Sequence, residues 1–215
     1  MKIRLTKVGT YRRLTLQGWL LITCIIMFFI FVWSITIHDF LAVNKPLETN
    51  LWIIEGYVPD FILENIAVEA KKNPDLMLIC AGLSIEKTRL FGGYNNYADY
   101  NAAILQYVGV DSLQTVSAHA VYADKERTYT TALVAREKLK DLGYVSGNVN
   151  VVCVGTHARR SQLLYRKAFK PEWNVGVISY VDNNYPKQWW RTSEGARAVV
   201  YEMFAYLYCV IFFHP

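Results

Sequence analysis

An uncharged run of 19 residues, Trp19–Ile37 (WLLITCIIMFFIFVWSITI), follows a tail that carries five basic residues and no acid. A helix of that length can cross the roughly 30 Å hydrocarbon core of a bilayer. Basic residues resist translocation, so the tail is expected to stay in the cytoplasm. The run therefore predicts a transmembrane helix over residues 16–38, behind a cytoplasmic tail of residues 1–15 and ahead of everything that could form a folded core.

A cleaved signal peptide is the alternative to a membrane anchor. Its apolar region would be about 7–15 residues long and would end at small residues. This run is longer and is followed by His38, Asp39, Phe40 and Leu41, with no A-x-A site. We therefore expect an uncleaved signal anchor in the cell (inner) membrane, with one carboxyl-terminal domain on the extracytoplasmic, periplasmic side.

The charge of the chain is concentrated in the tail. The formal net charge is +5, from 23 basic and 18 acidic residues, and the five basic residues of the tail account for the whole excess. The remainder is balanced, which disfavours nucleic acid as a partner. The expected partners are the lipid bilayer, through the anchor, and an anionic small-molecule or lipid-linked ligand.

The positions of the four cysteines do not indicate a disulfide framework. Cys24 lies in the apolar run, Cys80 and Cys153 end apolar strand-like segments, and Cys209 lies in an apolar helical stretch. A Cys80–Cys153 bridge is conceivable in an oxidising compartment, but we expect buried free thiols. No cysteine or histidine spacing indicates zinc.

After a polar linker, expected over residues 39–49, short apolar runs alternate with longer amphipathic ones through residues 50–215. The apolar runs predict five strands, at 51–55, 76–80, 113–117, 149–154 and 175–180. The amphipathic runs predict helices at 60–72, 97–108, 125–142, 157–169 and from 193 to about 212, with Asp60 and Ser193 as N-caps. This alternation indicates an α/β fold, a Rossmann-like doubly wound five-stranded parallel sheet preceded by one N-terminal transmembrane helix. Right-handed crossovers predict the strand order 3-2-1-4-5.

In an open parallel sheet, ligands bind beyond the carboxyl ends of the strands. Three of these ends carry glycine, namely Gly56, Gly82 and Gly155, and glycine lets the backbone approach a ligand closely. No Walker motif and no G-x-G-x-x-G motif occurs, so the sequence names no cofactor.

The strongest local motif is Gly155–Ser161, where the most apolar strand meets the next helix. Unpaired backbone N–H groups and the helix dipole favour an anion there, with Thr156, His157 and Arg160 alongside. The equally weighted alternative is that Thr156 only caps the helix and Arg159 only faces solvent.

Three further candidates flank this motif. Arg127, followed by Thr128, opens a helix, where a cation is unfavourable unless an anion meets it, while hydroxyls in a first turn usually cap. Glu55 ends a buried strand, so it either pairs with an arginine or acts on a ligand. Asp99 is either a ligand contact or a simple helix-start acid.

Several motifs resemble one branch of the SanA/YdcF/ElyC family of bacterial envelope proteins. Leu51–Asp60 (LWIIEGYVPD) is similar to the branch's VVEGW-x-PD opening, and Arg127–Ala132 (RTYTTA) to its RTY-x-SA segment. Gly155–Tyr165 (GTHARRSQLLY) resembles its HARRSRLLY helix, and Trp189–Gly195 together with Glu202 resembles its carboxyl-terminal segment. The chain departs from the wider family at Ala81-Gly82, where Gly-Gly is usual. The resemblance implies a Rossmann-like domain, often membrane-anchored, that serves envelope maintenance, and it aligns Asp99 loosely with an acid at a helix start.

Two functions follow from these observations. In the first, the domain binds or processes an anionic, phosphate-bearing ligand in cell-envelope biogenesis or barrier maintenance, with His157 and Glu55 as catalytic residues and Arg127 and Arg160 as anion clamps. In the second, a non-catalytic scaffold or regulatory factor acts through an aromatic partner surface that includes Trp189 and Trp190. A closed pocket at the strand ends favours the first function. A filled crevice with both tryptophans exposed favours the second.

Overall fold

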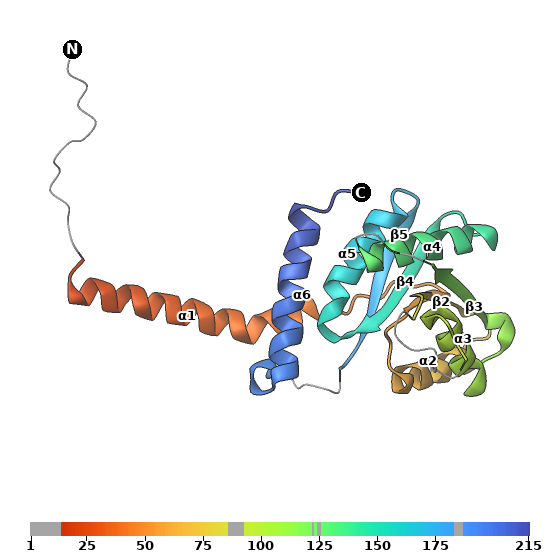
Figure 1. The fold of residues 1–215 in the computed structure, drawn as a ribbon, viewed down its shortest axis with the longest axis horizontal. Helices are drawn as coiled ribbons and strands as arrows, with labels where there is room; N and C mark the ends of the chain where they lie inside the picture. Colours follow the sequence, from red (N-terminus) through yellow and green to blue (C-terminus); the bar gives the residue numbers. More distant parts are fainter. Residues whose placement is uncertain (1–13, 86–92, 122, 124–125, 183–186) are drawn as a thin grey trace, which may run out of the picture. The chain divides into compact units, whose positions relative to one another are not determined.

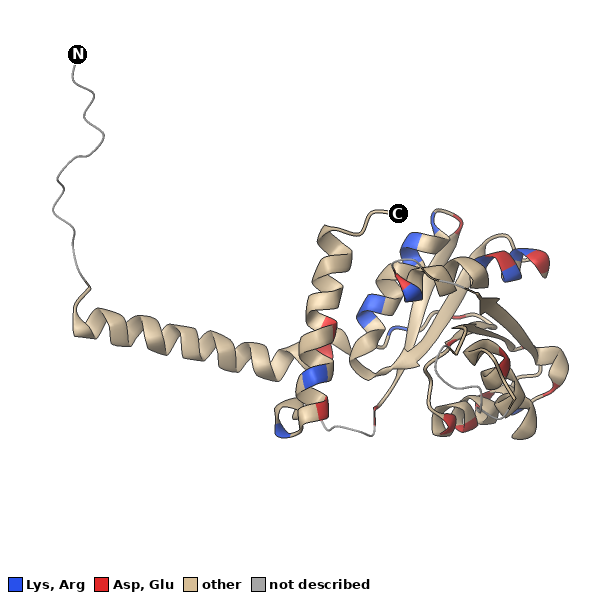
Figure 2. Ribbon diagram, in the orientation of Figure 1, with Lys and Arg blue, Asp and Glu red and all other residues tan. Residues whose placement is uncertain are grey.

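The computed structural model describes residues 14–85, 93–121, 123, 126–182 and 187–215 (Figure 1). Contacts divide the chain into two compact units, Met1–Ile37 and His38–Pro215. Nearly all of the expected basic tail lies outside the described residues. The first element, α1 (Leu16–Leu41), is 26 residues long, a stretch of 18 residues within it has a mean hydropathy of 2.7, and Figure 2 shows that the helix is almost without charge. It is long and apolar enough to cross a membrane, as the sequence predicts.

Five parallel strands form the centre of the second unit: β1 (Leu51–Glu55), β2 (Met77–Leu83), β3 (Thr115–Ala120), β4 (Gly147–Val154) and β5 (Trp173–Tyr180). Their order is β3-β2-β1-β4-β5, which confirms the predicted doubly wound topology. Glu55 stands opposite Ala81 on the neighbouring strand, so the carboxyl ends of β1 and β2 lie at one edge of the sheet. The order reverses between β1 and β4, which is where this fold provides a crevice.

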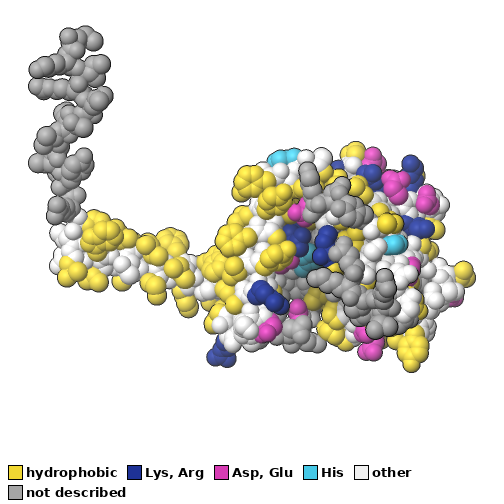
Figure 3. Space-filling view, viewed as in Figure 1, with side chains coloured by type: hydrophobic (Ala, Val, Ile, Leu, Met, Phe, Trp, Pro, Cys, Tyr) yellow, Lys and Arg dark blue, Asp and Glu magenta, His cyan; other side chains and the backbone are white. Residues whose placement is uncertain are grey.

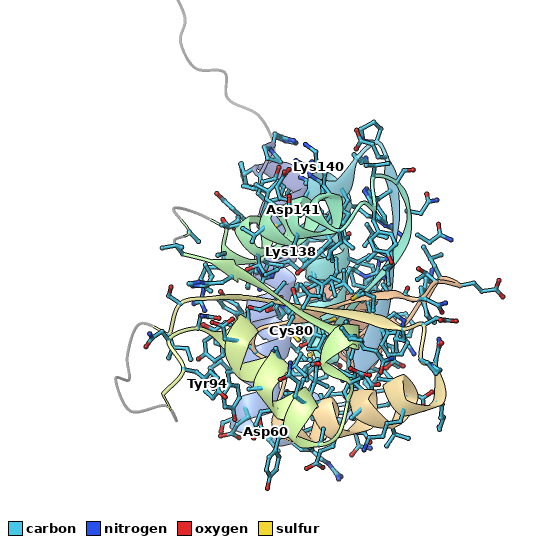
Figure 4. The ribbon with its side chains drawn as sticks, turned by 90° about the vertical axis from the view of Figure 1, so that its right-hand side faces the viewer. Asp60, Cys80, Tyr94, Lys138, Lys140 and Asp141 are labelled. Carbon is cyan, nitrogen blue, oxygen red and sulfur yellow. The ribbon has the colours of Figure 1, made fainter. Side chains whose placement is uncertain are left out.

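Helices cover both faces of the sheet. One core cluster joins the sheet to α2 (Asp60–Lys72) and α3 (Tyr97–Tyr107), and the other joins it to α4 (Arg127–Asp141) and α5 (Ala158–Phe169). Neighbouring residues of β1 divide between them, because Ile53 packs in the second cluster and Ile54 in the first. Figure 4 shows Asp60 and Lys138 on opposite sides of Cys80, which lies in the sheet. The strands are accordingly buried on both faces, and Cys80, Cys153 and Cys209 are free buried thiols, as expected.

Several helix starts differ from the sequence-based expectation. Residue 125 lies outside the described residues, and α4 begins at Arg127. Helix α2 is preceded by Pro59, so Asp60 is its first residue and not its cap. The final helix, α6 (Ser193–Ile211), is capped by Thr192, whose Oγ1 accepts a hydrogen bond from the Gly195 N–H at 3.1 Å.

The segment expected as a free linker is bound to the sheet. Lys45 forms an antiparallel bridge with Val177 of β5. The buried amide of Asn150, in β4, accepts from the Leu47 N–H at 2.8 Å and donates to the Leu47 carbonyl at 2.9 Å. A polar residue is thus satisfied inside an apolar strand, because its amide serves the backbone groups of the chain that leads out of α1.

Candidate functional site

A cavity of about 540 Å³ opens at the carboxyl ends of β1, β2 and β4, with α4 and α6 forming its walls. Its position is the one that the strand order predicts for a ligand site. Seven of the candidate residues line it: Glu55, Gly56, Gly82, Arg127, Thr128, Thr156 and His157. Asp99, Gly155 and Arg160 are not in its lining.

Glu55 is buried at the end of β1 and forms no ion pair with any arginine that the structure describes. Its Oε2 atom lies 3.2 Å from Nε2 of His157. The hydroxyl of Ser161, in the first turn of α5, lies 2.9 Å from both carboxylate oxygens and donates to them. Strand β1 and helix α5 therefore meet at one carboxylate, and within the described part of the chain the alternative Glu55–Arg pair does not form.

His157 lies between two carboxylates. It ends a 3₁₀ turn, η2 (Gly155–His157), that joins β4 to α5, and 27% of its side chain is exposed. Its second ring nitrogen, Nδ1, lies 3.0 Å from Oε1 of Glu202, which α6 contributes. When doubly protonated, the ring donates one hydrogen bond to each acid, which fixes the plane of the imidazole.

Arg160 is held by Glu202, one turn of α5 beyond His157. Its Nε donates to Oε2 at 2.7 Å and its Nη2 donates to Oε1 at 3.0 Å, a bidentate pair. Its Nη1 atom lies 3.8 Å from Oε2 of Glu126. The guanidinium group that the sequence suggests as an anion clamp is thus already engaged by carboxylates.

The charges of this network shift one another's pKa. Burial lowers the pKa of His157, but Glu55 and Glu202 outweigh it and raise the value to about 9. Burial raises the pKa of Glu202, yet hydrogen bonds from Arg160 and His157 lower it to about 2. At neutral pH the imidazole of His157 is therefore doubly protonated and positively charged, whereas the carboxylate of Glu202 is ionised.

Cys153 lines the cavity beside these acids, but it is not a reactive thiol. Burial, followed by the negative charges of Glu55 and Glu202, raises its pKa well above the usual value. Because the thiolate is the nucleophile and the metal ligand, this side chain stays inert. Within the described part of the chain, no three His, Cys, Asp or Glu side chains are arranged to hold a metal ion.

Two arginines at the cavity make no ion pair with any described acid. Arg127, the first residue of α4, has its guanidinium carbon 4.9 Å from the centre of the Tyr57 ring. Arg197, on α6, also lines the cavity and is exposed. Asp182 also lines the cavity. The nearby threonines do not cap α4, because Thr131 Oγ1 donates back to the Arg127 carbonyl at 2.9 Å.

The glycines of the site serve packing. A Cβ at Gly56 would lie 2.9 Å from Cβ of Tyr97, and a Cβ at Gly82 would lie 2.9 Å from the backbone nitrogen of Ala98. Both residues therefore let the start of α3 approach the ends of β1 and β2. Gly155 has a φ of 50°, in the left-handed region that favours glycine, and this conformation turns the chain into η2.

Asp99 belongs to a different cluster, between α3 and β3. Its backbone N–H donates to Asn96 Oδ1 at 2.8 Å, and its carboxylate accepts from Ser117 at 2.5 Å and from Asn96 Nδ2 at 2.5 Å. Asp99 is therefore an acid at a helix start, which is one of the two roles that the sequence allows for it.

Glu202 is the functional candidate that was missed among the site residues. In the sequence it belongs only to the segment that resembles the carboxyl-terminal part of the family. An acid inside an apolar stretch must find a partner if it is buried, and that signal could have marked it. Ser161, Glu126 and Arg197 carry no comparable signal, because polar residues on amphipathic helices usually face solvent.

No protein-family model, curated protein or solved structure matches this chain. The resemblance to the SanA/YdcF/ElyC family therefore stays a prediction from the motifs.

Proposed function

We propose that the cavity binds an anionic, phosphate-bearing ligand on the extracytoplasmic side of the membrane that α1 crosses. The main support for this proposal is the position of two arginines. Arg127 and Arg197 both line the cavity, and neither forms an ion pair with a described acid. A planar guanidinium group offers paired N–H donors that match phosphate oxygens. The positive charges of His157 and Arg160 offset the negative charges of Glu55 and Glu202, so Arg127 and Arg197 are the lining cations that no described acid pairs.

Glu55 and His157 are the proposed catalytic pair for any processing of the ligand. Both line the cavity, and their facing atoms are 3.2 Å apart. With a pKa of about 9, His157 enters a reaction at neutral pH as a proton donor. Glu55 would hold the imidazolium in place through its contact with Nε2.

The alternative, a scaffold that acts through exposed tryptophans, has weaker support. Trp189 is 6% exposed and Trp190 is 47% exposed, so one of the two indoles is inside the fold. A cavity at the strand ends together with a buried Trp189 supports a ligand-binding domain over the scaffold.

A role in cell-envelope biogenesis or barrier maintenance, in a protein of the SanA/YdcF/ElyC type, completes the proposal. It rests on the motifs and on an anchor that leaves the domain outside the cytoplasm. A carboxyl-terminal alkaline phosphatase fusion should be active, because that enzyme folds only outside the cytoplasm. An active cytoplasm-only reporter at the same position would contradict this topology.

Ligand binding can be tested on the full chain purified in mild detergent. Mass spectrometry should find a phosphorus-bearing small molecule with the native chain and much less with an Arg127→Ala, Arg197→Ala double variant. Loss of a charged hydrogen bond costs about 1.5–3 kcal/mol, or roughly tenfold or more in affinity for each arginine. Lys72→Ala is the matched control, because Lys72 is an exposed cation paired only with Glu69 at 2.9 Å. Equal yields from all three proteins, or no such molecule, would refute the proposal.

A further inference from the structure

Helix α6 has an apolar outer face. The buried side of the helix is formed by Gly195, Val199, Glu202 and Cys209. The opposite side is exposed, and at helical spacing it presents one stripe of side chains: Arg197, Val200, Tyr201, Phe204, Leu207, Tyr208 and Ile211. Figure 3 shows apolar side chains gathered over this helix.

The exposed side of α6 is mainly apolar, although exposure to water favours polar and charged side chains. A helix on the surface of a soluble domain normally turns charged residues outward. Here Phe204 is 62% exposed, and no charged residue occurs between Glu202 and the end of the helix at Ile211. The one cation of the stripe, Arg197, is at its amino-terminal end, and Figure 2 shows that charge on α6 is limited to that half. Apolar and tyrosine side chains with an arginine at the margin are typical of helices that lie in a membrane interface.

The chain itself ties α6 to the point where α1 leaves the lipid. The ring of Phe40, three residues beyond the apolar run, packs edge-to-face on Tyr206 at 5.7 Å between centroids. The Arg159 guanidinium lies 3.8 Å from the centre of the same Phe40 ring, and its Nε donates to the Phe40 carbonyl. Phe40 follows the last residue of the apolar run, Ile37, by three positions and belongs to the same compact unit as α6.

From this we infer that the outer stripe of α6 lies on the lipid bilayer, with its apolar side chains at the headgroup and acyl boundary. The inference rests on the proposed membrane anchoring. A second copy of the chain is a weaker occupant, since the anchor supplies lipid to this surface at every protein concentration. Arg197 and Tyr201 belong both to the stripe and to the cavity lining, so docking brings the rim of the cavity to the level of the headgroups.

Site-specific photo-crosslinking tests this placement in the full chain. The photoreactive residue p-benzoylphenylalanine replaces Phe204 in protein reconstituted into vesicles of phosphatidylcholine and phosphatidylglycerol. Tyr107, the last residue of α3 and 88% exposed, is the matched aromatic control on the domain surface. Phe29, inside α1, is the control for anchoring itself. Adducts are identified by mass spectrometry of the peptides.

The expected result is lipid adducts at positions 29 and 204, with a yield at 204 several-fold above that at 107. Adducts at 29 with no excess at 204 would overturn the docking of α6 and leave the anchor intact. Adducts at 204 to a second copy of the chain, in place of lipid, would also overturn it. No adduct at 29 would remove the anchoring on which the inference rests. The ligand test on Arg127 and Arg197 is independent of all these outcomes.

Discussion

Arg160 and Glu202 are 42 positions apart in the chain and are joined by two hydrogen bonds, of 2.7 and 3.0 Å. One residue is on α5 and the other is on α6, so this pair and the His157–Glu202 contact hold the last helix against the site. The pairing satisfies the condition for burying these charges, because each buried ion meets an opposite charge at hydrogen-bond distance.

Removing one member of this pair should destabilise the domain strongly. Arg160→Ala leaves Glu202 buried with only His157 as a partner, and breaking a buried ion pair costs about 3–5 kcal/mol. For a chain of this size that lowers the melting temperature by roughly 10 °C. Adding Glu202→Gln to the same chain should restore part of the loss, because it removes the orphaned charge.

The control for this prediction is Lys72→Ala. Lys72 and Glu69 form an ion pair of similar length, 2.9 Å, but both side chains are largely exposed. Exposed pairs contribute about 0–1 kcal/mol, so the control should melt close to the native temperature. Near-UV circular dichroism of both variants checks the difference, and equal melting temperatures would show that the buried network contributes no stability.

Stability should fall as the pH rises from 6.5 towards about 9. The pKa of His157 is raised from 6.5 to about 9 in the folded protein, so its contribution is complete below pH 6.5 and is lost as the proton leaves. Glu202 acts in the opposite direction, since its pKa is lowered from 4.5 to about 2 and its contribution is lost as the pH falls through that range. Urea unfolding at a series of alkaline pH values should show that the free energy of unfolding declines less in His157→Gln than in the native chain. The same decline in both proteins would assign the effect to other groups.

Asn150→Ala should cost at least about 2 kcal/mol, because it leaves the N–H and carbonyl of Leu47 without their partner. The comparison is Asn174→Ala on the neighbouring strand. Asn174 is exposed and bonds only the side chain of Asn148, at 3.1 Å, so its loss should be small. Chemical denaturation of the two variants measures the difference, and a neutral Asn150→Ala would mean that the segment before β1 adds little to the domain.

Thr192→Ala should destabilise α6 by about 1 kcal/mol, the usual cost of losing an N-cap. Ser193→Ala should have a smaller effect, since the Ser193 hydroxyl only donates to the adjacent Glu194. Thermal melts of the two single variants distinguish them. The reverse order would mean that Ser193 caps the helix, as the sequence alone suggests.

The sequence predicted the fold because the fold depends on local periods. Apolar runs such as Val149–Val154 require burial on both sides, and amphipathic runs between them require helices on both faces. Crossover handedness then determines the strand order, and with it the meeting of Glu55 and His157 at one edge. The 19-residue apolar run likewise predicts the long apolar helix by length alone.

The sequence did not predict which charges would pair. Glu202 meets Arg160 and His157 only because α6 packs against α5, and no local pattern encodes the distance between two helices. The same is true of Asn150, whose amide is satisfied by a segment 103 positions earlier in the chain. The sequence by itself determined the long apolar helix, the strand–helix alternation and the edge of the sheet where the strands end. Only the tertiary structure decided that Arg160 is held inside a charge network while Arg127 and Arg197 line the cavity without a described acid as partner, because a buried charge must be paired by whatever the packing brings beside it.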